Sequence, residues 1–473
     1  MKTPHNNSVT KGTIWSAVDK FGIVALQFII NLVMARLLTP YDFGLVGMIL
    51  IIVAVSTILI DGGFGAALIQ KSNADERDFS TTFYINIIAA AVLYALIFLA
   101  APYVATFLGN PIFERLLKVI SLVLIINSVG VVPKTKLRKA FAFKQIAIAN
   151  LVSYTMAAVI AIVIAWMGYG YWGLIAIHIV NSIFSSLLLW LFARWHPTKQ
   201  FSLKALKQLF KYGEYILISD ILSNACFHIQ STLIGKYFAP ATAGQYSQAK
   251  KMEEVASITL PNAMVQVLFP LFSEMQDNNN KLLSSLRLSN KITAFIIFPI
   301  LTLLIIIAEP IILFLFGSNW AGAIHYFQVL CIGGYFGALQ YFTYFAVAAT
   351  GQSKALFYAG IIKSIFLLGA IFVTAHISME AVLLAMVLSN VVNYLTNGVI
   401  AAKHVGYKML RQMGDVAPIL LISLLIGAIT LGVDHLWNIH WALLSLIYLL
   451  LYLAIATLSH NEIVSLVLAK CRR

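Results

Sequence analysis

Charged residues are scarce in this chain of 473 residues. Asp, Glu, Lys and Arg together make up 11% of it, whereas hydrophobic residues make up 60%. The mean hydropathy is +0.89. A soluble domain usually carries about 25% charged residues, so this chain cannot cover itself with polar surface. The composition excludes an ordinary soluble globular protein and indicates a protein embedded in lipid.

Cysteines and the common motifs of enzyme chemistry are also lacking. The three cysteines lie in apolar runs (Cys226 and Cys331) or near the tail (Cys471), so we expect no disulfide framework. The sequence contains no G-x-x-x-x-G-K-[ST], H-E-x-x-H, G-x-S-x-G or C-x-x-C pattern, which excludes sites of those types. No predicted loop is long enough to fold separately, which argues against a membrane glycosyltransferase or ligase.

Long apolar runs are what the sequence has in abundance. A helix needs about 20 residues to cross a hydrocarbon core of ~30 Å. Runs of that length are expected to be helical, because lipid offers no partners for backbone polar groups. The sequence therefore predicts an all-α integral membrane protein with fourteen transmembrane helices. They cover residues 14–35, 43–69, 82–107, 112–132, 146–167, 172–193, 212–234, 243–272, 292–316, 321–349, 356–375, 381–401, 416–434 and 441–459.

The basic residues predict the orientation. With an even number of spans, both termini lie on one side of the membrane, and the segments on that side hold 24 of the 32 Lys and Arg residues. The opposite loops hold four, namely Arg36, Arg115, Lys118 and Lys236. The positive-inside rule then predicts that both termini are cytoplasmic. The net charge of +14 reflects this topology and attraction to anionic membrane lipids, and we expect no nucleic acid among the partners.

A polar break between two apolar runs occurs twice, about 200 residues apart. Residues 35–46 (A-R-L-L-T-P-Y-D-F-G-L-V) and 235–246 (G-K-Y-F-A-P-A-T-A-G-Q-Y) share a base, a proline and a glycine at equal spacing. We interpret the repetition as a duplicated unit, with chance similarity between Leu- and Ala-rich segments as the alternative. The predicted domains are an N-terminal lobe (1–206), a C-terminal lobe (207–412), and two last spans with a cytoplasmic tail (413–473).

Several polar side chains fall inside predicted spans, where charges are costly and often functional. The residues predicted to line a substrate cavity are Lys20, Gln27, Asn31, Asp220, Asn224, His228, Lys250, Lys251, Glu254 and Lys363. Structural alternatives stay open. Lys20, Asp220 and Lys363 lie close enough to the cytoplasmic ends of their spans to reach the membrane surface. Lys250 and Glu254 are i, i+4 neighbours, so with Glu253 the cluster can instead be an internal salt-bridged patch.

Five segments carry a family resemblance that covers nearly the whole chain. They are A-R-L-L-T-P-Y-D-F-G (35–44), D-G-G-F-G-A-A-L-I-Q (61–70), V-P (132–133) with the basic residues after it, G-Q-Y-S-Q-A-K-K (244–251) and L-F-P-L-F-S (268–273). The sequence resembles the polysaccharide transporter (PST) family of the MOP flippase superfamily, the branch of O-antigen, colanic-acid and teichuronic-acid type exporters. That family often has Arg where this chain has Gln248 and Lys251. Lys251 keeps the positive charge, whereas Gln248 does not.

The resemblance implies two six-helix lobes with pseudo-twofold symmetry around a central cavity, plus helices 13 and 14. It implies a flippase of the bacterial inner membrane that moves undecaprenyl-diphosphate-linked oligosaccharide to the periplasmic leaflet by alternating access, with polysaccharide polymerase machinery as a further partner. No enzymatic reaction, cofactor or metal is implied, and coupling to H⁺ or Na⁺ is left open. The alternative function is a drug/cation antiporter of the same superfamily, for which a mainly acidic cavity is expected.

Overall fold

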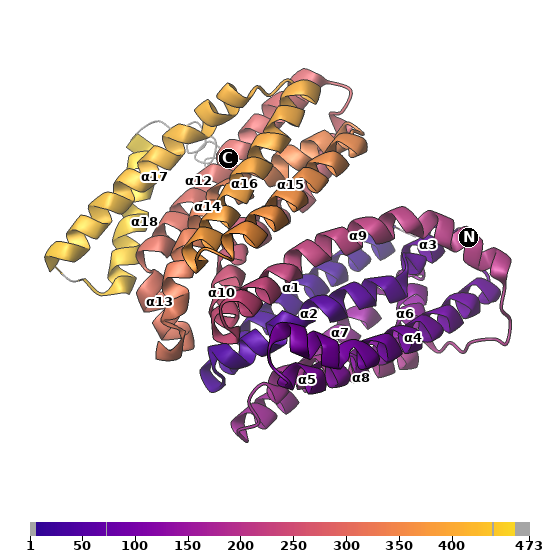
Figure 1. The fold of residues 1–473 in the computed structure, drawn as a ribbon. Helices are drawn as coiled ribbons and strands as arrows, with labels where there is room; N and C mark the ends of the chain where they lie inside the picture. The colour runs from indigo at the N-terminus through magenta and orange to yellow at the C-terminus, as the bar shows by residue number, and fades with distance from the viewer. Residues whose placement is uncertain (1–5, 72, 438, 459–473) are drawn as a thin grey trace. The chain divides into compact units, whose positions relative to one another are not determined.

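The computed structural model describes residues 6–71, 73–437 and 439–458, and all regular structure in this part of the chain is helical (Figure 1). Contacts between helices divide the chain into two compact units, Met1–Gly244 and Gln245–Arg473, which are described separately. The predicted lobes came from the repeated sequence and not from contacts, so their boundaries at residues 206 and 412 stay predictions.

The first unit contains nine helices and the start of a tenth. They are α1 (Asn6–Leu37), α2 (Pro40–Asp61), α3 (Phe64–Gln70), α4 (Glu76–Leu108), α5 (Ile112–Ile120), α6 (Leu122–Lys139), α7 (Phe143–Trp166), α8 (Trp172–Ala193), α9 (Leu203–Tyr237) and α10 (Pro240–Glu254). The second unit continues α10 and adds η1 (Val255–Thr259), α11 (Leu260–Glu274), α12 (Asn279–Ile306), α13 (Ala308–Phe316), η2 (Ser318–Trp320), α14 (Gly322–Ala349), α15 (Ser353–Thr374), α16 (Met379–His404), α17 (Met409–Trp437) and α18 (Trp441–Leu458).

Within the described residues, eleven helices are long and apolar enough to cross a membrane, or up to twelve if one bent pair forms a single span. That pair is Pro240–Gln266 and Leu268–Glu274, which meet at 49°. The all-α membrane-spanning fold is confirmed. The number of fourteen transmembrane helices stays a prediction. The run predicted at 212–234 lies in α9, where several side chains fall outside the described residues, and the run at 441–459 corresponds to the shorter α18.

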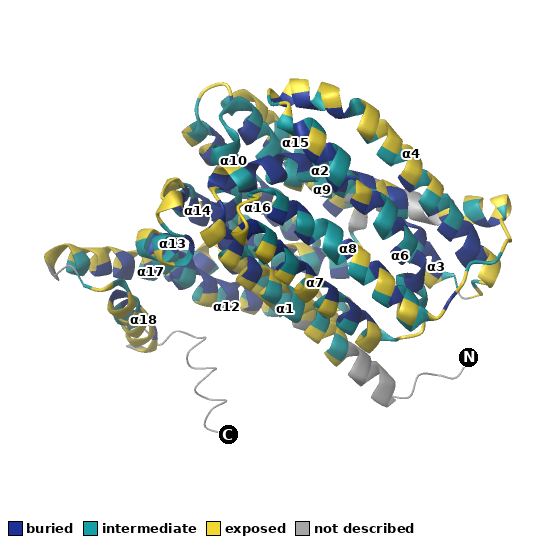
Figure 2. Ribbon diagram, turned by 90° about the horizontal axis from the view of Figure 1, so that it is seen from below, coloured by how far each residue is buried: buried dark blue, intermediate teal, exposed yellow. Residues whose placement is uncertain are grey.

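Apolar side chains cover the outside of the helices as well as the inside. Figure 2 shows many exposed residues along α4, and among them are Val92, Leu96 and Leu99, which are 53–68% exposed. Soluble proteins rarely expose apolar surface on this scale. These side chains are therefore placed to contact lipid.

The repeated polar break forms a helix start. In α2, the Thr39 hydroxyl accepts the Asp42 amide, and the Asp42 carboxylate accepts the Thr39 amide at 2.9 Å, which is a capping box. Pro40 occupies the first turn, where its missing N–H costs nothing. The other Asp42 oxygen accepts the Tyr171 amide at 3.0 Å and so fixes this turn to the segment that precedes α8. The sequence thus sets both where α2 begins and what its first turn contacts.

The two repeated glycines meet each other at these helix starts. A Cβ atom on Gly44 would lie 1.6 Å from the Pro240 carbonyl oxygen, and one on Gly244 would lie 1.9 Å from the Pro40 carbonyl oxygen. Each imagined Cβ would also lie 3.0–3.1 Å from the amide nitrogen of the other glycine. Backbone therefore packs directly on backbone where α2 and α10 begin, which only glycine permits. The reciprocal contact gives the sequence repetition a structural role.

Residues 134–139 differ from their prediction. The fourth span was predicted to end at residue 132 and to be followed by a basic loop, but α6 continues to Lys139. The basic side chains suit a helix end, because cations favour the C-terminal carbonyl groups. Lys139 donates to the Leu68 carbonyl at 3.0 Å, and Lys136 pairs with Glu76 at 2.5 Å. These contacts let the helix extend beyond the apolar run.

The second unit is fastened by a bidentate ion pair between α12 and α17. Arg287 Nε and Nη2 each donate to a different Asp415 oxygen at 2.7 Å, and the Tyr407 hydroxyl donates to Asp415 at 3.0 Å. The Asp415 side chain is only 9% exposed. Burial, with the Asp415 carboxylate beside it, raises the pKa of the Tyr407 hydroxyl well above its ordinary value. The phenol therefore stays a donor at any pH the protein meets.

Replacing Asp415 with asparagine tests this pair. The variant Asp415→Asn is expected to lower the free energy of unfolding by about 2–3 kcal/mol, because the Arg287 guanidinium loses its charged partner. Thermal unfolding of the purified protein in detergent measures the change. The control is Glu380→Gln, which removes the His325–Glu380 pair (55% and 59% exposed); exposed pairs contribute about 0–1 kcal/mol. Equal effects of both variants would contradict the role given to Asp415.

Candidate functional site

The residues predicted on the first span do not all face the interior of their unit. Lys20 and Gln27 are exposed on α1, and Asn31 is half-buried. On α9, Asn224 and His228 are half-buried, and the His228 ring lies 5.0 Å from that of Phe227, centroid to centroid. The Asp220 side chain lies outside the described residues. That these residues of α1 and α9 line a substrate cavity therefore remains a prediction.

A polar network joins α1, α7 and α8 inside the first unit. The Asn150 side-chain amide donates to both Asp19 carboxylate oxygens, at 2.9 and 3.2 Å. One turn further along α7, the fully buried Ser153 hydroxyl lies 3.0 Å from both the Asn150 carbonyl and the Asn181 side-chain oxygen. Asp19, the neighbour of the predicted Lys20, thus contacts another helix of the first unit.

Cationic side chains from α6 lie near the same network. Lys134 is half-buried, within electrostatic range of Asp19 on α1, of Asp61 on α2 and of Arg138 on its own helix. Asp61 itself faces Gly65, whose imagined Cβ would lie 3.1 Å from the Asp61 oxygen. Two carboxylates and two bases from three helices thus gather at one end of the first unit. Ionisable groups inside or at the ends of spanning helices are costly and are often functional.

The second cluster lies on α10 in the second unit. Lys250 Nζ lies 3.9 Å from a Glu254 oxygen, with both side chains mostly buried, and lies over the Tyr246 ring at 5.8 Å. Lys251 is exposed on the same helix, and the Glu254 carboxylate is within electrostatic range of it as well. The structure thus separates the two lysines. Lys250 belongs to an ion pair with Glu254, whereas Lys251 is an exposed residue of the same helix.

Two further residues of the second unit were singled out in the sequence. They are Gln248, where the resembled family often has Arg, and Lys363, which was predicted to line the cavity. Gln248 is 1% exposed, and neither side-chain polar atom has a hydrogen-bond partner among the described residues. An unsatisfied buried amide is costly, so this position is suited to a water or a polar ligand group. Lys363, on α15, is half-buried.

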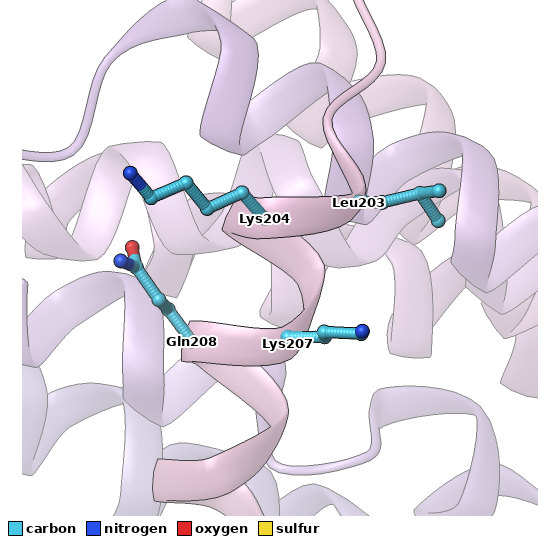
Figure 3. Close-up of a pocket in the computed structure, with 4 residues that line it drawn as sticks. All are labelled: Leu203, Lys204, Lys207 and Gln208. Atoms are coloured by element: carbon cyan, nitrogen blue, oxygen red, sulfur yellow. The ribbon is translucent and has the colours of Figure 1, made fainter.

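A hollow of about 470 Å³ lies beside the first two turns of α9. It is lined by Leu203, Lys204, Lys207 and Gln208. Figure 3 shows Lys204 and Gln208 extending together from one side of the helix, while Lys207 and Leu203 extend from the other. Because the two ammonium groups diverge, they cannot hold one phosphate group between them. We therefore place no site there.

The sequence-based prediction did not select several of the residues that the structure brings into these clusters. Asn150 and Ser153 carry no charge, so only their spacing of three on one helix could have indicated them. Lys134 was assigned to a loop, although it follows an apolar run without a break. Glu253 was considered only as a member of a possible salt-bridged patch, and its burial depends on a neighbouring helix that periodicity cannot show.

Comparisons with known proteins identify relatives of this chain. A family model described as "Polysaccharide biosynthesis protein" matches residues 33–325. The succinoglycan biosynthesis transport protein ExoT of Rhizobium meliloti (strain 1021) is 28% identical over 421 residues, covering 88% of this chain and 83% of ExoT. The teichuronic acid biosynthesis protein TuaB of Bacillus subtilis (strain 168) is 24% identical over 436 residues, covering 90% of each.

The fold is similar to that of a solved membrane protein. The lipid II flippase MurJ, in an inward closed conformation, superposes with a TM-score of 0.79 at 15% sequence identity. The match covers 96% of this chain and 100% of that one. At this identity the likeness concerns the fold alone.

Proposed function

This chain belongs to the polysaccharide biosynthesis protein family, and we propose that it is a flippase for lipid-linked oligosaccharides. It moves undecaprenyl-diphosphate-linked repeat units from the cytoplasmic to the outer leaflet for surface polysaccharide synthesis. The observation that carries the proposal is the family match, which includes both repeated helix starts. The names of two relatives support it, since ExoT is a biosynthesis transport protein and TuaB a biosynthesis protein for bacterial polysaccharides.

The chemistry of such a substrate fits the clusters described above. A diphosphate brings negative charge into the hydrocarbon region, where fixed cations must replace its hydration. Lys251 on α10 and Lys134 with Arg138 on α6 are bases within or at the end of spanning helices. The sugar hydroxyl groups need hydrogen-bond partners, and Gln27 and Asn31 on α1 take this role in the proposal. The protein is a transporter, and its residues bind and release the substrate without making or breaking covalent bonds.

The finer architecture is part of the proposal. We propose fourteen spans in two six-helix lobes with pseudo-twofold symmetry, a central cavity, and two additional C-terminal helices. Corresponding helices pack alike in the two units, which supports this arrangement: α4 on α6, α6 on α8 and α7 on α8 in the first, and α12 on α14, α14 on α16 and α15 on α16 in the second. Rocking of such lobes gives alternating access.

Membrane, orientation and partners follow from the same reasoning. We propose the bacterial cytoplasmic membrane with both termini in the cytoplasm, supported by 24 basic residues on that side against four on the other. The partners are the lipid-linked oligosaccharide, the surrounding lipids and the polysaccharide polymerase machinery. Coupling to an H⁺ or Na⁺ gradient belongs to the proposal as well.

Deletion of the gene tests the function. Mass analysis of the lipid fraction is expected to show undecaprenyl-diphosphate oligosaccharide accumulating in the deletion strain, while polymer disappears from the cell surface. Expression of the wild-type chain should reverse both changes. Increased drug sensitivity with unchanged lipid-linked intermediates would instead favour the drug/cation antiporter and reject the flippase.

A further inference from the structure

A π-helix lies between α10 and α11. η1 (Val255–Thr259) follows directly on Glu254, and the Leu260 amide bonds to the Val255 carbonyl, five residues back. Pro261 stands in the first turn of α11 and has no N–H to continue the α-helical ladder from η1. Single π-turns inside helices often mark functional positions. Glu253 lies directly before such a turn, two residues from its first residue, Val255.

Glu253 is buried at this interruption. The residue is 7% exposed, and its carboxylate accepts the hydroxyl of Ser257, which is 2% exposed on η1. The carboxylate lies against Gly334 of α14, where an added Cβ would come within 2.7 Å of its Oε1 atom and within 3.3 Å of the Leu301 methyl groups from α12. The glycine therefore makes room for the carboxyl group. A carboxyl group held this way has little access to water.

The side chains around the Glu253 carboxyl group come from three helices. Its own helix contributes Tyr246, Lys250 and Glu254, and of these Lys250 lies 3.9 Å from Glu254. From α14 come Cys331 and Tyr341, whose thiol and phenol are within electrostatic range. From α12 comes the aliphatic Leu301. Two carboxyl groups thus share the neighbourhood of Lys250, and the ammonium group lies in ion-pair distance of Glu254.

We infer that Glu253 is the residue that takes up and releases the coupling proton during transport. The inference rests on the proposed flippase function and assigns its energy source. In the arrangement described, a protonated Glu253 fits between Ser257 and Gly334. Loss of the proton to water leaves a carboxylate that needs hydration, and a shift of η1 toward α-helix rotates it away from Gly334. Protonation and helix register then change together, which couples the proton to the conformation that moves the substrate.

Proteoliposomes test the assignment. The purified full-length protein is reconstituted with a fluorescent undecaprenyl-diphosphate disaccharide, and the label in the outer leaflet is measured by chemical quenching, with and without a pH difference of one unit. One coupled proton per substrate corresponds to about a tenfold ratio between the leaflets, because one pH unit is a factor of ten. The wild type is expected to reach this ratio. Glu253→Gln should still exchange the label but reach equal amounts in both leaflets, whereas Glu309→Gln, an exposed carboxyl on α13, should behave as wild type.

Each other outcome has a defined meaning. A wild-type protein that does not move the label at all rejects the proposed function with this probe. A wild-type protein that moves it to equal amounts despite the pH difference overturns only the coupling inference. The same holds if Glu253→Gln still reaches the tenfold ratio. If Glu253→Gln fails to fold, the inference is also overturned, because glutamine imitates the protonated side chain that the buried site should accept.

Discussion

Replacing Gly44 with alanine is expected to abolish accumulation of the folded protein. The added methyl group would occupy the space of the Pro240 carbonyl, 1.6 Å from its oxygen. Ordinary overpacking costs about 1–3 kcal/mol because side chains can move aside. Here the neighbour is backbone in a helix start, so we expect a loss of at least ~4 kcal/mol, in the range of the most damaging single substitutions. Fluorescence-detected size-exclusion chromatography measures the amount of folded protein, and thermal unfolding measures the loss of stability.

The same helix offers a matched control. Gly47 lies one turn after Gly44, and its imagined Cβ meets only the Ser231 Cβ at 3.9 Å, an ordinary contact. Gly47→Ala is therefore expected to stabilise the protein by about 0.5–1 kcal/mol, because alanine favours the helix. Gly244→Ala should resemble Gly44→Ala, since the two contacts are reciprocal. Similar behaviour of the alanine variants at 44 and 47 would show that α2 and α10 do not meet in this way.

The glycine contact also shows what the sequence could predict about the fold. The matched proline and glycine predicted equivalent helix starts, because proline and glycine have fixed positional meanings that do not depend on distant neighbours. That the two starts contact each other could not be predicted, since contact depends on how the helices between them pack. The end of α6 was missed for a related reason. Hydropathy predicts which residues lie in the hydrocarbon region. The end of a helix depends instead on where its last carbonyl groups gain hydrogen-bond partners outside the helix.

The sequence predicted which residues of the spans carry the candidate site, but it did not predict which of their side chains point into the protein. Sequence spacing placed Lys250, Lys251, Glu253 and Glu254 within five residues of one span, and the structure keeps them there. The burial of Glu253 depends on Gly334, 81 residues further along the chain, because a Cβ there would lie 2.7 Å from the Glu253 carboxylate. On α1, Lys20 was the predicted residue, whereas the structure shows Asn150 donating to the neighbouring Asp19. Helical periodicity shows which residues lie on the same face of a helix, but it does not show which other helix that face contacts.

Replacing Lys251 with alanine is expected to abolish export while leaving the protein folded and inserted. The exposed side chain supplies charge to the substrate diphosphate in the proposed function, and the family often has arginine at this position. Lys251→Arg should therefore retain much of the export, because positive charge is what the diphosphate requires. The measurements are surface polymer and the amount of protein in the membrane, scored separately for each variant.

The neighbouring lysine separates a substrate role from a structural one. Lys250→Ala should lower the stability by about 1–3 kcal/mol, because it leaves the mostly buried Glu254 carboxylate without its ammonium partner. The double variant Lys250→Ala, Glu254→Ala should recover that stability. Lys251→Ala should show no such loss, and the addition of Glu254→Ala should not restore its export. If Lys251→Ala, Glu254→Ala exports normally, Lys251 serves the internal charge balance of α10, and the diphosphate must be held by other bases, of which Lys134 and Arg138 are the first to test.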